Sequence, residues 1–215
     1  MHNNIPKKFY FINSFNENII NNLDNNTGVI YRNYTKKLDI KEIIKIKEFC
    51  LKKKVRFYLS NNFKIALKLR LDGAYLPSFN KNYRHLSYKI RHSFLILGSA
   101  HNINEIRIKE VQRVNFIFIS SIFKKNKNYL GIYRFRKIRK LTKKNVIALG
   151  GISQKNIKKI RLLDCNGLSG ISYFEKKRPQ KMGPFLNSLS MQIRMQMLTP
   201  FDNLLYRLKK CYLRC

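Results

Sequence analysis

The segment Val146–Ser153, VIALGGIS, is the clearest indication of the fold. Its short run of β-branched and aliphatic residues ends in Gly150-Gly151, and a helical pattern around Ile157 follows. This order predicts a buried strand, a tight turn and a helix that begins near Ser153. Because glycine lets the backbone approach a ligand closely, the N–H groups of the pair can reach an anion near the helix N-terminus. The pattern favours a phosphate site, with a simple tight turn as the alternative.

Seven other segments have the same strand-like character, and helical patterns separate most of them. The eight expected strands are Lys8–Ile12, Gly28–Tyr31, Val55–Leu59, Gly73–Leu76, Phe94–Leu97, Asn115–Ile119, Val146–Leu149 and Gly167–Ser172. Strands that alternate with helices pair in parallel through right-handed crossovers. Eight such units predict an α/β fold, a compact (β/α)8 TIM barrel smaller than the ~250 residues usual for it. A doubly wound open sheet is the alternative, although no GxGxxG follows the first strand.

The chain is expected to divide into the barrel, residues 1–184, and a basic C-terminal extension, residues 185–215. The extension begins after Gly183-Pro184, and its apolar residues around Met195 and Leu205 predict a short helical tail. This tail either closes the bottom of the barrel or contacts a partner.

The charge of the chain is strongly one-sided. Lysine and arginine outnumber aspartate and glutamate by 45 to 11, which gives a formal net charge of +34. Such a charge first suggests nucleic-acid binding. The basic residues are nevertheless dispersed over almost every segment, and they accompany many Asn and Ile residues, as is typical of an AT-rich genome. We therefore expect only non-specific nucleic-acid binding.

The sequence also bears on the compartment. No apolar run approaches the ~18 residues of a membrane span, and residues 1–11 lack the apolar centre of a signal peptide. We expect a cytoplasmic protein that contacts no membrane. The four cysteines form no CxxC pair and no zinc spacing, so Cys50 and Cys165 are expected to be buried, reduced thiols.

In a TIM barrel the working face lies at the carboxyl ends of the strands. Almost all of the 11 acidic residues instead fall on expected helices, helix caps, the opposite face or the tail, and Glu175 alone lies just past an expected strand. Because Mg²⁺ prefers carboxylate oxygens, a magnesium site is only weakly supported and no metal ligand is assigned. The rim is cationic and polar, which predicts an anionic ligand.

His101 is the only histidine at the end of an expected strand. The ordinary pKa of histidine suits a proton shuttle, so His101 is the candidate catalytic residue. A structural role in capping the following helix is the alternative.

Six segments, in order and at matching spacing, resemble the thiamine phosphate synthase and TenI family of (β/α)8 barrels. They are Leu71–Pro77 (LDGAYLP), Gly98–Ile106 (GSAHNINEI), Phe116–Phe123 (FIFISSIF), Leu130-Gly131, Val146–Ser153 and Asn166–Ser172 (NGLSGIS). The resemblance covers residues 28–174. It implies that the ligand is a phosphorylated thiazole or thiamine phosphate.

The resemblance also assigns roles to residues. It implies a phosphate on Gly150, Gly151, Ile171 and Ser172, a diphosphate on Arg32, and a position near the substrates for Ser99. In synthases of this family a pyrimidine diphosphate ionises with the help of Mg²⁺, and the thiazole nitrogen attacks the resulting cation. Both family Mg²⁺ aspartates appear here as Asn61 and Asn80, so the metal site departs from the family pattern.

Three functions remain open at this point. The resemblance first implies a thiamine phosphate synthase. It also admits a TenI-type thiazole tautomerase, which needs a proton shuttle but no Mg²⁺, and His101 matches the catalytic histidine position of that branch. The third is a non-catalytic protein that binds phosphorylated small molecules or RNA.

Overall fold

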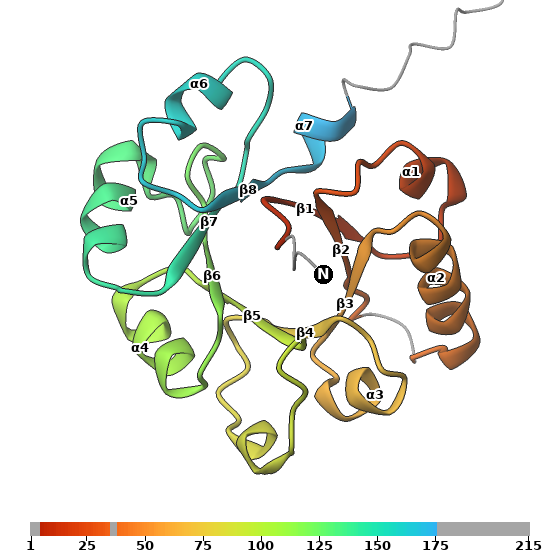
Figure 1. The fold of residues 1–215 in the computed structure, drawn as a ribbon. Coiled ribbons are helices and arrows are strands. Elements are labelled where there is room, and N and C mark those ends of the chain that lie inside the picture. Colours follow the sequence, from red (N-terminus) through yellow and green to blue (C-terminus); the bar gives the residue numbers. More distant parts are fainter. Residues whose placement is uncertain (1–4, 35–37, 176–215) are drawn as a thin grey trace, which may run out of the picture. The chain divides into compact units, whose positions relative to one another are not determined.

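Eight parallel strands close into a barrel in the computed structural model, which describes residues 5–34 and 38–175. The strands are β1 (Lys8–Ile12), β2 (Thr27–Tyr31), β3 (Arg56–Ser60), β4 (Gly73–Leu76), β5 (Leu95–Ala100), β6 (Phe116–Ile119), β7 (Asn145–Leu149) and β8 (Gly167–Ser169). They follow one another around the ring in sequence order (Figure 1). Because β8 pairs with β1, in the register Phe9 opposite Ser169, the sheet has no open edge. The predicted TIM barrel is confirmed, and the doubly wound open sheet is excluded.

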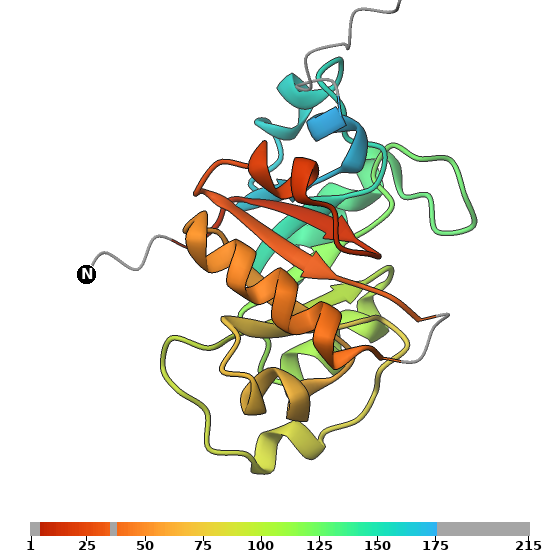
Figure 2. The same ribbon diagram turned by 90° about the vertical axis from the view of Figure 1, so that its right-hand side faces the viewer.

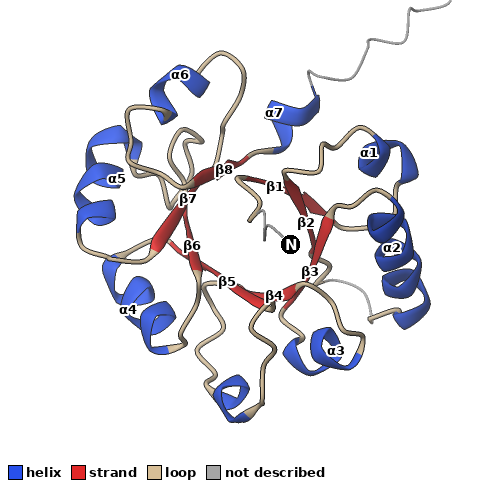
Figure 3. Ribbon diagram, in the orientation of Figure 1, coloured by secondary structure: helices blue, strands red, loops and turns tan. Residues whose placement is uncertain are grey.

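Helices cover the outside of the strand ring (Figure 3). They are α1 (Glu17–Asn21), α2 (Ile40–Lys52), α3 (Phe63–Lys68), the 3₁₀ helix η1 (Arg84–Ser87), α4 (Ile103–Val111), α5 (Gly131–Lys140), α6 (Ile157–Ile160) and α7 (Ile171–Glu175). Helix α2, the longest of those described, lies along the wall of the barrel (Figure 2). Its N-cap is Asp39, whose carboxylate accepts from the backbone N–H groups of Lys41 and Glu42, as a capping aspartate should.

Most strand boundaries lie within a residue of the expected ones, but β5 continues to Ala100, three residues past the expected Leu97. Two further boundaries differ near the end of the barrel. Strand β8 ends at Ser169, and helix α7 begins at Ile171, within the segment expected to be a strand. Because β7 ends at Leu149, which lies opposite Ser169, the residues beyond Ser169 have no partner strand on that side. The helix after the glycine pair begins at Ile157 instead of near Ser153.

Two apolar clusters hold the barrel together. The inner one fills the strand ring with large side chains: Phe9, Phe11, Ile30, Tyr58, Tyr75, Leu95, Leu97, Phe116, Phe118 and Ile147. Their rings meet edge to face, as Phe9 and Phe118 do at 5.0 Å between centroids. The outer cluster packs the other strand face against the helices. The barrel interior is therefore a packed core, and ligand access is confined to its rims.

The expected extension, residues 185–215, lies outside the described residues, so its helical character stays a prediction. Among the residues that are described, no helix has the length and apolar character needed to cross a membrane.

Candidate functional site

A cavity of about 440 Å³ opens at the carboxyl ends of β1, β2, β7 and β8. Its lining residues are Phe11, Arg32, Lys124, Leu149, Gly150, Gly151, Ile152, Gly170 and Ile171. Four of the six residues that the sequence assigned to phosphate, diphosphate or substrate binding thus meet in one cavity, although they come from three separate parts of the chain. Ser172 belongs to α7, and its side chain lies outside the described part of the structure.

The glycine pair after β7 is part of the lining of this cavity. Gly150 and Gly151 have φ angles of +103° and +73°, in the region where a side chain is strained. A Cβ atom on Gly151 would lie 2.6 Å from the backbone nitrogen of Lys124. The carbonyl of Gly150 in turn accepts from the backbone N–H of Phe123 at 2.9 Å, so the loop after β6 is fastened to the end of β7. These contacts explain why the backbone, and not side chains, faces the cavity here.

Two cationic side chains border the same cavity. The guanidinium of Arg32 lies over the ring of Phe11, with 4.7 Å between Cζ and the ring centroid. Cation–π contact of this kind holds a guanidinium in place while its N–H groups stay available. Lys124 also lines the cavity, and it is exposed. Together with the glycine backbone, these two charges suit an anion carrying phosphoryl oxygens.

Ser99 does not line this cavity. It is buried near the end of β5, and its hydroxyl hydrogen-bonds to the phenol of Tyr75 in the barrel interior. Burial raises the pKa of the Tyr75 phenol well above its usual range, and the Ser99 hydrogen bond and the charge of Arg32 oppose that shift. Ser99 therefore helps to position Tyr75 near the carboxyl ends of the strands. Its proximity to the substrates stays a prediction.

His101 also lies apart from the cavity. Its ring Nδ1 is 2.9 Å from Oε2 of Glu105, and its backbone N–H donates to the same oxygen. The N-cap of α4 is the next residue, Asn102, whose side chain accepts from the N–H of Glu105. The histidine and the carboxylate thus form part of the capping arrangement of α4, which matches the structural alternative for His101. A catalytic role for His101 stays a prediction.

The two residues for which the resemblance implied metal-ligand positions, Asn61 and Asn80, form an amide pair. Asn80 Nδ2 donates to Asn61 Oδ1 at 2.8 Å, and Asn80 Oδ1 accepts from the backbone N–H of Asn82 at 2.9 Å. Both amide oxygens are engaged, and neither carries a charge. Among the described residues there is no group of three or more His, Cys, Asp or Glu side chains that could hold a metal ion. Residues at this corner do not fit Mg²⁺, which prefers carboxylates and water.

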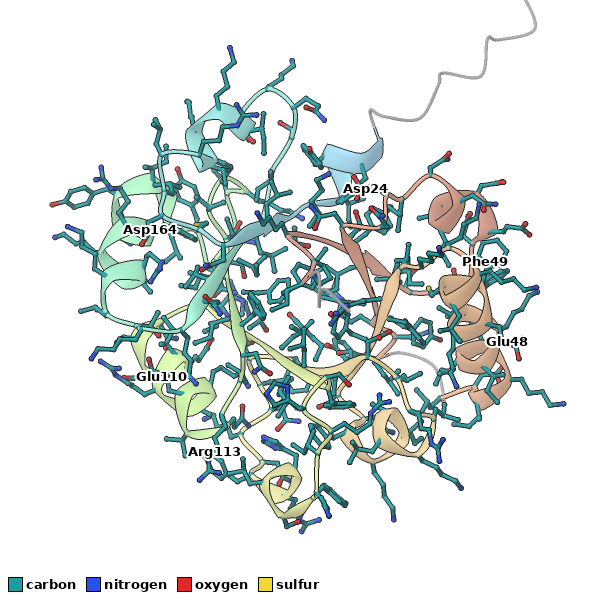
Figure 4. The ribbon with its side chains drawn as sticks, in the orientation of Figure 1. Asp24, Glu48, Phe49, Glu110, Arg113 and Asp164 are labelled. Carbon is teal, nitrogen blue, oxygen red and sulfur yellow. The ribbon has the colours of Figure 1, made fainter. Side chains whose placement is uncertain are left out.

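Several of the described carboxylates lie on the outside of the molecule. Glu48, Glu110 and Asp164 are labelled on the outer ring of the molecule (Figure 4). Asp24 and Asp164, expected on helices or their caps, instead lie in the turns before β2 and β8. Asp72 lies before β4, as expected, and accepts from the backbone N–H of Phe57. At the carboxyl ends of the strands, Glu42 accepts from Tyr31 and Glu105 accepts from His101, so both carboxylates already have partners.

Sequence reasoning missed a buried lysine beneath this face. Lys109 on α4 is 0% exposed, and its Nζ donates to the carbonyls of Pro77 and Asn80 and to Oε1 of Gln112, each at 2.8 Å. Burial lowers the pKa of this ammonium to about 8, and the charge of Glu105 opposes that shift. The spacing gave a signal, because Lys109 follows Ile106 by three residues and so shares its helix face. On the same helix the apolar Val111 is instead 60% exposed.

Comparisons with known proteins agree with this geometry. The model of the family described as thiamine monophosphate synthase (TMP-TENI) matches residues 15–174. The thiamine-phosphate synthase of Methanococcus vannielii is 24% identical over 132 residues, which span 60% of this chain and 64% of that protein. That of Fusobacterium nucleatum is 26% identical over 145 residues, which span 66% and 70%.

Solved structures show the fold independently. The thiamine phosphate pyrophosphorylase from Pyrococcus furiosus superposes with a TM-score of 0.65 at 16% identity, covering 80% of this chain and 92% of that one. FabK from Thermotoga maritima has a TM-score of 0.63 at 10% identity, covering 79% and 59%. Likeness at such identities carries the barrel alone. The family follows from the match over residues 15–174, and the chain belongs to the thiamine monophosphate synthase (TMP-TENI) family.

Proposed function

We propose that the protein is a thiamine phosphate synthase that joins a pyrimidine diphosphate to thiazole phosphate. The observation that carries this proposal is the cavity that Arg32 and Lys124 line together with Gly150 and Gly151. In it the thiazole phosphate would bind through its phosphoryl oxygens to the glycine backbone near Gly170 and Ile171. The family membership supports this choice over a barrel enzyme of another chemistry.

The reaction requires no redox partner. The bond between the pyrimidine-bearing carbon and the diphosphate oxygen breaks, and the diphosphate leaves with the electron pair. The lone pair of the thiazole nitrogen then forms the new carbon–nitrogen bond. This chain contributes orientation of the thiazole phosphate and two positive charges, Arg32 and Lys124, beside the leaving diphosphate. Such charges stabilise developing negative charge most strongly where they are held in place beforehand.

A direct assay tests the proposal. Purified protein is incubated with thiazole phosphate and the pyrimidine diphosphate, with Mg²⁺ in one series and EDTA in another, and thiamine phosphate is measured. The proposal expects product above the protein-free background in at least one series. Absence of product in both, together with retained binding of thiazole phosphate by calorimetry, would favour a binding protein instead.

Nucleic acid remains a secondary partner in this proposal. Helices α5 and α6 carry exposed lysines and arginines and no acidic residue. Such a surface favours contacts with nucleic-acid phosphates without readout of the bases. We propose that such binding is independent of sequence. Its affinity should collapse between roughly 50 and 200 mM salt, which filter binding with two unrelated RNA sequences would measure.

A further inference from the structure

The corner between the ends of β3 and β4 carries the two residues at the family metal positions, Asn61 and Asn80. The facing atoms, Asn61 Oδ1 and Asn80 Nδ2, are 2.8 Å apart. Adjacent oxygens around Mg²⁺ are about 3 Å apart, because each lies roughly 2.1 Å from the ion in an octahedron. The separation therefore suits a metal, whereas the atoms do not: one of the two is an N–H donor that points at the other.

The orientation of the Asn80 amide is fixed from its other end. Its Oδ1 accepts from the backbone N–H of Asn82, and a backbone N–H can only donate. The NH₂ group of Asn80 must therefore face Asn61. Turning the amide over to offer oxygen to a cation would break the bond to Asn82 and also the bond to Asn61.

A buried cation supports the same corner from below. Lys109 Nζ and Gln112 Nε2 both donate to the carbonyl of Asn80, at 2.8 and 3.1 Å. Lys109 Nζ also donates to the carbonyl of Pro77, the residue that directly follows β4. All three acceptors of this ammonium are neutral oxygens. The two acidic residues of the same helix have other partners, because Glu105 is bound to His101 and Glu110 accepts from Arg107 and Thr142. The corner therefore already contains one positive charge.

We propose that the buried ammonium of Lys109 and the Asn61–Asn80 amide pair replace a divalent cation at this corner, so that the site binds its anionic ligand without metal. The ammonium ties the loop after β4 in place, and the amide pair joins that loop to the end of β3. The ligand's charge is then met by Arg32 and Lys124 across the barrel mouth. The identity of the ligand in this inference rests on the proposed function. The claim that this corner does not bind a divalent cation is independent of that function.

The first experiment uses the unsubstituted chain. Mg²⁺ alone, at roughly millimolar concentrations, should give no saturable heat in calorimetry and no rise in melting temperature. Thiazole phosphate should bind with the same affinity in EDTA and in Mg²⁺. Saturable binding of Mg²⁺ to the free protein, or a tenfold or greater gain in ligand affinity with Mg²⁺, would overturn the proposal. Failure of thiazole phosphate to bind at all would count against the proposed function and leave the Mg²⁺ titration intact.

The second experiment restores the carboxylates. The double variant Asn61→Asp/Asn80→Asp brings two like charges to the facing positions, so its melting temperature in EDTA should fall by roughly 5 °C or more. Mg²⁺ should recover most of this loss, because the oxygens now have both the charge and the spacing that the ion needs. A variant that folds normally but shows no response to Mg²⁺ would contradict the claim that the amides exclude the ion.

A matched control distinguishes the specific effect of the Asn61–Asn80 pair from a general effect of added negative charge. Asn62 and Asn82 lie on the same two loops, and their side chains accept from backbone N–H groups of Ile65 and Arg84. The double variant Asn62→Asp/Asn82→Asp adds the same charge and keeps both of these bonds. It should show no recovery with Mg²⁺, and a recovery equal to that of the first variant would refute the specific role of Asn61 and Asn80. Should Asn61→Asp/Asn80→Asp fail to fold, the titration of the unsubstituted chain still decides.

Discussion

The ammonium of Lys109 donates a hydrogen bond to the main-chain carbonyl of Asn80, with 2.8 Å between Nζ and the oxygen. A residue of α4 thus fixes the loop that carries one of the two asparagines at the carboxyl face. Replacing this link with an apolar side chain leaves the carbonyls of Pro77 and Asn80 and the amide oxygen of Gln112 short of a donor.

We therefore expect Lys109→Met to lower the free energy of unfolding by about 2–4 kcal/mol, since buried acceptors lose their partner. Urea denaturation followed by circular dichroism measures this change. The exposed α2 lysine in Lys41→Met provides the control, and its effect should stay within about 0.5 kcal/mol. Equal effects of the two substitutions would show that the buried ammonium contributes nothing to the loop. Hydrogen exchange at the N–H of Asn82 should also quicken in Lys109→Met alone.

Charge at the cavity mouth gives a second prediction. Arg32→Gln and Lys124→Gln should each weaken thiazole phosphate binding about 10- to 100-fold, because a hydrogen bond to a charged group contributes roughly 1.5–3 kcal/mol. Calorimetry at low and high salt measures the loss. Lys125 follows Lys124 directly and is also exposed, but it is not among the residues that line the cavity. Lys125→Gln should therefore change affinity by less than about threefold, and a loss equal to that of Lys124→Gln would point to a general effect of charge.

The strand order could be predicted from the sequence, whereas the pairings at the carboxyl face could not. The apolar run Val146–Leu149 can be recognised as a buried strand from the sequence, because the glycine pair and polar residues that follow it differ in composition. The Asn61–Asn80 bond instead depends on the register that sets Ser60 opposite Tyr75 in β3 and β4. No local pattern encodes that register. Lys109 was missed for a related reason. A lysine on a helix is expected to be exposed to solvent, and the loop carbonyls that accept from Lys109 become its neighbours only in the folded structure.

The glycine pair after β7 gives a third prediction. Gly151→Ala introduces a Cβ atom 2.6 Å from the backbone nitrogen of Lys124, so the loop after β6 must shift away from its position over the cavity. We expect at least a tenfold loss of thiazole phosphate affinity in a protein that still folds. Gly131 at the start of α5 has a similar φ angle, +65°, but its Cβ would lie 3.3 Å from the side chain of Tyr129. Gly131→Ala should cost about 1 kcal/mol of stability and leave affinity unchanged. Unaltered affinity in Gly151→Ala would show that the phosphate binds elsewhere.

The two described cysteines give a prediction about pH. Burial raises the pKa of the Cys50 and Cys165 thiols to about 12. Because the thiolate is the reactive form, both should resist iodoacetamide at pH values near 8–9 in the folded protein and react once it unfolds, when the pKa returns to about 8.5. A raised folded-state pKa also means that stability falls as pH climbs above that unfolded value. Peptide mass mapping of native and urea-treated samples measures the modification, and rapid native labelling of Cys50 would contradict its burial.

The last prediction concerns His101 and separates two enzymes of one family. The ring of His101 is held by Glu105 and does not line the cavity formed with Arg32 and Gly151. If the protein is a synthase, His101→Ala should remove a contact at the start of α4, lower stability by roughly 1 kcal/mol or less, and reduce product formation by less than tenfold. A tautomerase that used His101 as its proton shuttle would instead lose about 10²- to 10⁴-fold of its activity. Both reactions are measured on the unsubstituted chain and on His101→Ala, and Glu105→Gln is the control, because it weakens the same contact but keeps the imidazole. A loss above 10²-fold in thiazole isomerisation for His101→Ala, with Glu105→Gln nearly unaffected, would refute the synthase and establish the histidine as the working group.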